Sequence, residues 1–222
     1  MASVAPHRTR LPREDRMEQT LSVARALFAE RGYSAVTMDE VAADVGVTKP
    51  LLYNYFGNKE SLYIACMERA GDALSATIAS AVAETSSPEE ALRAGGQAFF
   101  AFLDSDRAAW EVLFDETLPR GGDVAEQVDA YRGKILGLVT ASIMGQVPPQ
   151  MQDAARIEVE ALSEALLGAA EALAHWWLRT EAISASDAAD LLIATIEPGL
   201  RDRWAPVARK TTPKAKSKGK SK

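Results

Sequence analysis

The stretch that decides the fold runs from Thr37 to Tyr63 and reads TMDEVAADVGVTKPLLYNYFGNKESLY. Its first four residues form a capping box, in which the Thr37 hydroxyl accepts from the Glu40 amide while Glu40 reaches back. Two valines four residues apart then mark the buried face of a short helix. Gly46 ends this helix, because a left-handed backbone is least costly at glycine.

A second helix follows directly. Thr48 offers its N-cap, and Pro50 lies in the first turn, where a missing N–H is tolerated. Leu52 and Phe56 are spaced to lie on one apolar side of the helix LLYNYF, and Asn58 caps the helix after it. This order of a helix, a glycine-containing turn and a second helix is the pattern of a helix-turn-helix DNA-binding motif.

The segment before Thr37 completes a small N-terminal domain, which we call the head. A helix is predicted from about Arg13 to Glu30, with Gly32 at its C-terminal end and Tyr33 closing it by a hydrophobic contact. The side chains expected to share one apolar core are Leu27, Phe28, Val41, Val45, Leu52 and Phe56. This core is small, so we expect the head to depend on the rest of the chain.

Composition places the chain among ordinary globular proteins: 222 residues, 47% hydrophobic and 25% charged. Its one cysteine, Cys66, cannot support a disulfide framework within the chain and is expected to be a small core residue. The first residues contain no apolar leader, and no stretch approaches the length of a membrane span. We therefore expect a cytoplasmic protein.

The net charge of −6 conceals an asymmetry. Residues 1–62 carry 8 Lys and Arg against 8 Asp and Glu, residues 63–208 carry 10 against 23, and residues 209–222 carry 7 against none. The acidic charge thus lies in a region that need not touch DNA, so an overall acidic chain remains compatible with DNA binding.

The remainder is predicted to be helical, with no alternating strand pattern. A helix from Lys59 to Ala83, with a candidate bend at Gly71, leads to breaks at ETSSPEE, DSD, LPRGG, GQVPP and SAS. The helices between these breaks fall near 88–103, 106–116, 123–145, 149–180 and 186–197. The predicted fold is all-α, with an N-terminal arm (1–12), a DNA-binding head (13–62), a helical ligand-binding and dimerisation domain (63–207) and a lysine-rich tail (208–222).

The segment LFAERGYSAVTMDEVAADVGVTKPLLYNYFGNKESLY closely resembles the DNA-binding domain of the tetracycline-repressor (TetR) family of bacterial regulators. The likeness covers about Arg13 to Met67 and preserves an ordered set of features. These are Phe28, the Gly32-Tyr33 pair, Thr37, the helix end from Ala42 to Gly46, and Leu52-Tyr53-x-Tyr55-Phe56 followed by Asn58-Lys59.

The resemblance implies which residues contact DNA. Lys49, Pro50 and Leu51 occupy the base-reading positions, and Lys49 can donate to guanine acceptors. The full predicted surface comprises Thr37, Met38, Thr48, Lys49, Pro50, Leu51, Tyr53, Asn54, Tyr55 and Lys59, in which the tyrosines and Lys59 match phosphate-contacting positions. The alternative is that the tyrosines are only half-buried aromatics and Lys59 only a solvated lysine.

The resemblance also implies a homodimer through the last two helices, as a palindromic operator requires. Small residues along 149–180 would let two helix pairs approach closely. The face predicted for this contact comprises Ala154, Ile157, Ala161, Glu164, Leu167, Gly168, Ala188, Leu191, Leu192, Thr195 and Ile196. The alternative is that this alanine-rich face packs inside one subunit.

A small-molecule pocket is the family's third feature. The candidate lining residues are Phe99, Phe102, Leu103, Trp110, Phe114, Tyr131, His175 and Trp176. Each of them has ordinary core packing as its alternative, and His175 is expected to be a packing histidine.

Catalysis finds no support in the motifs. The two histidines and one cysteine are too remote to form a metal cluster, and no phosphate loop or nucleophile motif occurs. We therefore expect no catalytic residues, metal or cofactor. The leading hypothesis is a homodimeric repressor released from a palindromic operator in double-stranded DNA by a small-molecule effector.

Alternatives remain open. The chain could be an architectural DNA binder that uses its basic tail without an effector, or the same fold could act as an activator. The tail itself is either solubilising or a non-specific DNA tether. The N-terminal residues are either a disordered leader or a basic arm along a DNA groove.

Overall fold

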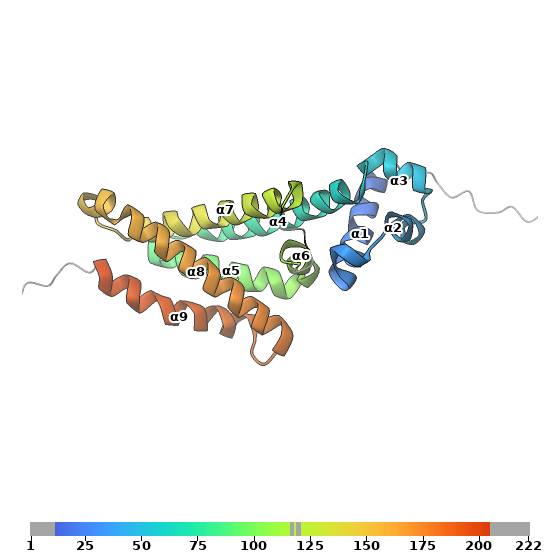
Figure 1. Ribbon diagram of the computed structural model, residues 1–222. Coiled ribbons are helices and arrows are strands. Elements are labelled where there is room, and N and C mark those ends of the chain that lie inside the picture. Colours follow the sequence, from blue (N-terminus) through green and yellow to red (C-terminus); the bar gives the residue numbers. More distant parts are fainter. Residues whose placement is uncertain (1–11, 116–117, 119–120, 205–222) are drawn as a thin grey trace, which may run out of the picture.

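The computed structural model describes residues 12–115, 118 and 121–204, and every element within them is a helix. A head formed by α1, α2 and α3 stands at one end of α4, and the other helices form an elongated body along it (Figure 1). The elements are α1 (Arg13–Ala35), α2 (Met38–Val45), α3 (Lys49–Phe56), α4 (Lys59–Ala83), α5 (Pro88–Ser105), α6 (Arg107–Leu113), α7 (Asp123–Met144), η1 (Pro149–Met151), α8 (Gln152–Thr180) and α9 (Ala185–Trp204). The all-α prediction is confirmed. The tail and almost all of the predicted N-terminal arm lie outside the described residues.

Helix α1 is longer than predicted, ending at Ala35 instead of Glu30. Gly32 interrupts it with φ 76° and ψ 160°, so two helical pieces meet at the glycine. Only glycine adopts this backbone without strain, which explains the break at this position. The turn brings the Tyr33 ring to 4.9 Å from the Tyr63 ring, edge to face.

The core of the head extends beyond the helix-turn-helix. Leu52 is fully buried and Phe56 nearly so, and the same cluster includes Tyr63, Cys66 and Met67 from α4. It also includes buried valines from α6 and α7. Burial raises the pKa of the Cys66 thiol to about 12, so this cysteine is a protonated packing residue.

The body has its own apolar core, to which α4, α5, α6, α7, α8 and α9 all contribute. Helix α4 runs without a break from Lys59 to Ala83, through Gly71. Gly71 serves packing: a Cβ atom there would lie 2.5 Å from Cδ1 of the Tyr131 ring. The absence of a side chain lets α7 approach α4 closely.

The last helix also runs further than predicted. We expected its end near residue 197, before Pro198, yet α9 continues to Trp204. A proline inside a helix removes one backbone hydrogen bond and crowds the preceding turn, but it does not always end the helix.

One face of α8 and α9 leaves apolar side chains uncovered. Ile157 is 79% exposed, Leu191 52% and Trp176 38%. Exposed alanines at 161, 165 and 172 continue the α8 face between Ile157 and Trp176. By contrast Leu167, Ala188 and Leu192, which were assigned to this face from the sequence, are buried in the body. Figure 1 shows α8 and α9 side by side along one side of the body.

None of the described helices combines the length and apolarity that crossing a membrane requires.

Candidate nucleic-acid interface and effector cavities

The turn between α2 and α3 has the geometry that its sequence predicts. The Thr37 hydroxyl accepts from the Glu40 amide at 3.3 Å, and Glu40 Oε2 accepts from the Thr37 amide at 2.8 Å, which completes the capping box. Gly46 is left-handed (φ 74°, ψ 35°), and the amide after it donates to Ala42 at 3.0 Å. These local bonds fix the angle between α2 and α3.

Helix α3 presents one face outward and one face to the core. Leu52 and Phe56 anchor it, while Lys49, Pro50 and Asn54 are exposed and Tyr53 is 41% exposed. Thr48 holds the N-cap position but its side chain makes no capping hydrogen bond. Its exposed hydroxyl and the first amides of α3 are therefore oriented outward at the helix N-terminus, which is favourable for a phosphate. Figure 1 shows α3 at the far end of the head.

Lys49 has a partner that spacing did not reveal. Its Nζ lies 2.7 Å from Oδ1 of Asp39, and the hydrogen bond to this carboxylate raises the pKa of the lysine. The same Nζ stands 5.9 Å from the centre of the Tyr53 ring. Both charged side chains are more than half exposed, so breaking this ion pair costs little and Lys49 can exchange Asp39 for a contact with DNA.

Tyr55 and Lys59 are half-buried and less free than the exposed residues of α3. The Arg13 guanidinium lies 5.5 Å from the centre of the Tyr55 ring. The Lys59 ammonium lies 4.4 Å from the centre of the Tyr33 ring and donates to the Ser34 carbonyl at 3.4 Å. Burial lowers the pKa of Lys59. Arg13 was not among the predicted residues, and nothing in its spacing indicated this contact.

Two other predicted residues lie at the start of α2. Thr37 is exposed but its hydroxyl is used by the capping box. Met38 is 6% exposed, with its side chain in the head core, so only its backbone remains near the outer surface. Leu51 is half-buried beside the exposed residues of α3.

The head is tied to the body through α6 and its C-terminal end. The Tyr33 amide donates to Asp115 at 2.5 Å, and the Tyr63 hydroxyl donates to the Val112 carbonyl at 2.6 Å. Arg25 on α1 pairs with Asp106, the residue before α6, at 2.5 Å. A shift of α6 would therefore be transmitted to α1 and to the turn before α2.

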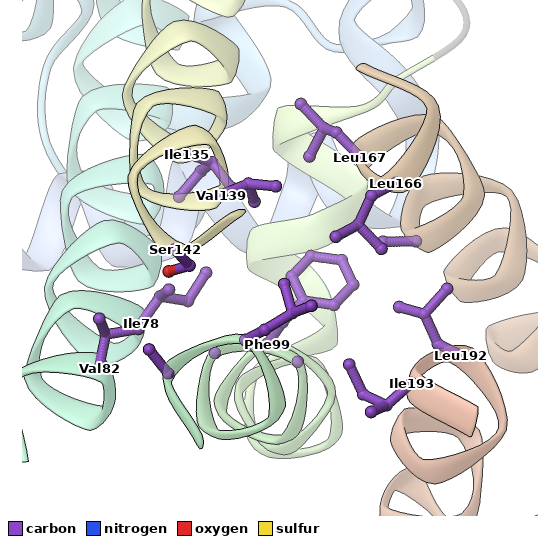
Figure 2. A pocket seen from close by; sticks show the side chains of 15 residues that line it. Ile78, Val82, Phe99, Ile135, Val139, Ser142, Leu166, Leu167, Leu192 and Ile193 are labelled. Atoms are coloured by element: carbon purple, nitrogen blue, oxygen red, sulfur yellow. The ribbon is translucent and has the colours of Figure 1, made fainter. Parts of the chain in front are cut away.

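The body contains an apolar chamber, partly open to the surface, between α4, α5, α7, α8 and α9. Figure 2 shows Ile78, Val82, Phe99, Val139 and Leu166 turned toward it. Its volume is about 60 Å³. Among the described residues that line it, only Ser142 has a polar side chain, and its hydroxyl donates to the Leu138 carbonyl at 3.0 Å.

A second, smaller cavity of about 30 Å³ adjoins the chamber and is lined partly by Phe114, Tyr131 and Arg132. An open cleft between α1, α6 and α8 is larger, about 390 Å³, and has mixed polarity. Trp110 and His175 line this cleft together with Phe114.

The predicted pocket residues thus fall in several places. Phe99, Phe114 and Tyr131 line the chamber or the smaller cavity, and Trp110 and His175 line the cleft between α1, α6 and α8. Phe102 and Leu103 are buried in the body core, and Trp176 lies on the outer face of α8. The aromatic rings mostly pack on one another; Trp110 and Phe114, for example, stack with ring centres 3.9 Å apart. The chamber wall is mainly aliphatic, a feature that aromatic residues in the sequence could not indicate.

A capped helix-turn-helix on one end of an all-helical, cavity-bearing body defines a class of proteins: helix-turn-helix DNA-binding regulators with an effector domain. Comparison with known proteins narrows this class. The family model of bacterial regulatory proteins of the tetR family matches residues 21–66, and that of tetracyclin repressor-like C-terminal domains matches residues 88–197. The chain belongs to the TetR family of DNA-binding transcriptional regulators, a non-enzymatic family.

Individual relatives agree with this assignment. The chain is 39% identical over 119 residues to the HTH-type transcriptional activator FasR of Mycolicibacterium smegmatis, a match covering 54% of each chain. It is 31% identical over 101 residues to the HTH-type transcriptional repressor KstR2 of Mycobacterium tuberculosis, covering 46% of this chain and 50% of that one. The chain thus spans about half the length of these curated relatives.

A crystal structure extends the likeness to most of the fold. The TetR-like transcriptional regulator from Rhodococcus sp. RHA1 is 31% identical, with a TM-score of 0.72. The match covers 86% of this chain and 98% of that one.

Proposed function

We propose that this chain is a homodimeric repressor that binds a palindromic operator through α3 and is released by a small-molecule effector held in the body. The observation that carries the proposal is the outward face of α3, where Lys49, Pro50, Tyr53 and Asn54 are exposed on a rigid, capped helix. In this reading Lys49, Pro50 and Leu51 face base edges.

The remaining predicted residues contact phosphates. Thr48, Tyr53, Asn54 and Tyr55 supply hydroxyls and an amide at the edge of the reading surface, and Lys59 supplies a charge. The Thr37 and Met38 backbone lies at the start of α2, beside the DNA strand. Since the head carries few cations, neutral donors are expected to provide a large share of these contacts.

Dimerisation is supported by the uncovered apolar face of α8 and α9. Its exposed alanines allow close helix approach, and Ile157, Trp176 and Leu191 are too large and apolar to be left in water without cost. Two copies joined there would present two α3 helices to successive half-sites, about one turn of DNA apart.

Effector response is supported by the cavities and by the contacts of α6. Phe114, which lines the smaller cavity, directly precedes Asp115, the acceptor for the Tyr33 amide. An effector that binds more tightly to one spacing of the heads shifts the dimer toward that spacing.

The test is footprinting on the DNA upstream of the coding sequence. A discrete palindromic footprint supports the regulator, whereas even coverage of any DNA would support an architectural binder. Lys49→Ala is expected to change sequence preference, whereas Tyr53→Phe should weaken binding to all sequences alike. If both variants bind every site as the parent does, the assignment of α3 fails.

Activation instead of repression is favoured by one observation, the similarity to FasR, which is named as an activator. The position of the footprint distinguishes the two. A site that overlaps the promoter supports repression, and a site upstream of it, with transcription lost on deleting the gene, supports activation.

A further inference from the structure

The chamber in Figure 2 restricts the chemistry of what can occupy it. None of its described lining residues is ionisable, and its one hydroxyl, on Ser142, is already bonded to Leu138. A charged or strongly polar group placed there would lose its hydration without gaining a partner. The part of a ligand that lies in the chamber must therefore be apolar.

The smaller cavity adjoins the chamber on the side of α6. The two cavities share three lining residues, Phe99, Ile135 and Leu167. Polar groups appear only in the smaller cavity, where Ser75, Tyr131, Arg132 and Glu171 contribute to the lining. A ligand that spans both cavities would thus place an apolar chain in one and a polar group in the other.

Most of those polar groups already have partners. Arg132 Nε and Nη2 donate to the two carboxylate oxygens of Glu171 at 2.7 and 3.1 Å, so their charges compensate each other. The Tyr131 hydroxyl is bonded to the Glu68 carbonyl and to Asp72, at 3.1 and 3.2 Å.

Ser75 differs from them. Its Oγ is buried and has no hydrogen-bond partner among the described residues. An unsatisfied buried hydroxyl is unfavourable, and rotation of the Ser75 side chain toward the smaller cavity would let a single uncharged donor or acceptor on a ligand satisfy it. A carboxylate would instead have to compete with Glu171 for Arg132.

The cavity volumes bound the size of the occupant. A water-sized group needs about 10–15 Å³ of such void, so the larger chamber has room for about four to six such groups. The smaller cavity, on the same measure, has room for about two or three. The total is about six to nine non-hydrogen atoms, the size of a medium-length chain.

We propose that the chamber and the smaller cavity form one site for a medium-chain aliphatic compound bearing a single uncharged polar group, such as an alcohol or ketone, bonded to Ser75. This rests on the proposed effector response and specifies the class of the effector.

The test is calorimetric titration of the full chain, without DNA, using straight-chain 1-alkanols and methyl ketones of four to twelve carbons and the matching carboxylates. Affinity is expected to rise about fourfold for each methylene added below the optimum and to fall beyond a total of about nine non-hydrogen atoms. Each carboxylate should bind at least about tenfold more weakly than the alkanol of equal length.

Two variants locate the site. Ser75→Ala should weaken alkanol binding about threefold to tenfold and at the same time raise the melting temperature of the free protein, since it removes an unsatisfied hydroxyl. If Ser75 had only a structural role, Ser75→Ala would change the melting temperature without weakening alkanol binding.

Gly95→Leu should abolish binding by filling the chamber. Gly95→Ala takes up far less of the chamber, because its Cβ meets Val82 and Ile78 at 3.5 and 3.7 Å, which are ordinary contacts, and it should retain binding with an optimal chain about one carbon shorter. Circular dichroism verifies that both variants are folded.

The proposal is overturned if no alkanol or ketone binds, if carboxylates bind more tightly, or if Ser75→Ala binds as the parent does. Operator release is measured separately. A compound that binds without altering the footprint would uphold the ligand class and refute effector release, and a chain with no discrete footprint refutes the regulator independently of the titration.

Discussion

At the scale of single residues, Lys49, which we propose reads bases, is held in an internal ion pair in the DNA-free head. Asp39 neutralises Lys49 at 2.7 Å and would also lie close to the DNA strand. We expect Asp39→Asn to raise affinity for any DNA about twofold to tenfold at low salt, because one repulsive charge is lost and one lysine is released.

The ratio of operator to non-specific affinity should fall in the same variant, and gel-shift titrations on both kinds of DNA measure it. Asp104→Asn is the matched control, since Asp104 is exposed on α5. Equal effects of the two substitutions would mean that general charge and not the Lys49 pair is responsible.

Glu40 gives the head a pH dependence. Its hydrogen bonds with Thr37, and secondarily with Arg31, lower the pKa of its carboxyl to about 2. A group whose folded pKa is lowered stabilises the fold above the ordinary carboxyl range and loses this contribution as pH falls toward the folded value. We expect the stability difference between the parent and Glu40→Gln to be present at pH 6–7 and to shrink below about pH 4.3.

Urea unfolding at a series of pH values measures this difference. A gap between parent and variant that stays constant down to pH 3 would show that the carboxyl charge contributes nothing.

At the scale of elements, the contact of α4 with α7 depends on a missing side chain. In Gly71→Ala the new Cβ would lie 2.5–2.7 Å from three carbons of the Tyr131 ring. Overpacking typically costs about 1–3 kcal/mol and the gain in helix propensity is about 1 kcal/mol, so the variant should lose up to about 2 kcal/mol overall. Gly95→Ala, with ordinary contacts, should gain stability instead, as denaturant unfolding would measure.

The helices also show how much of the fold could be predicted from the sequence. Helices α2, α3 and α4 begin where local signals predict, because Thr37, Pro50 and Asn58 act within a few residues of themselves. The packing role of Gly71 could not be predicted locally, since its partner Tyr131 is sixty residues away along the chain.

The candidate site could likewise be predicted only in part. The exposed residues of α3 follow from helical period and from the family resemblance. The ion pair of Lys49 with Asp39 crosses a turn, and no periodic pattern predicts it. The aliphatic chamber depends on how α4, α5, α7, α8 and α9 come together, so single positions in the sequence do not reveal it.

At the scale of the whole molecule, the proposed dimer has a direct test. Ala165 is exposed on α8 between Ile157 and Trp176. Ala165→Glu would place two charges in the closed interface, so we expect monomers and an operator affinity reduced to that of one head. Sedimentation and footprinting report the two effects.

Ala101→Glu, at an exposed alanine of α5, is the matched control and should remain dimeric. If Ala165→Glu also sediments as a dimer, the interface lies elsewhere.

Because Cys66 is buried, the labelling rate of the only thiol of the chain can report how often the molecule opens. The thiolate is the reactive form, and burial both raises the pKa to about 12 and shields the sulfur, which lies 3.7 Å from the Leu21 carbonyl. A thiol reagent must therefore wait until α1 separates from α4. With excess reagent the labelling rate reports how often the head loosens from its supporting helix, and bound DNA should slow it.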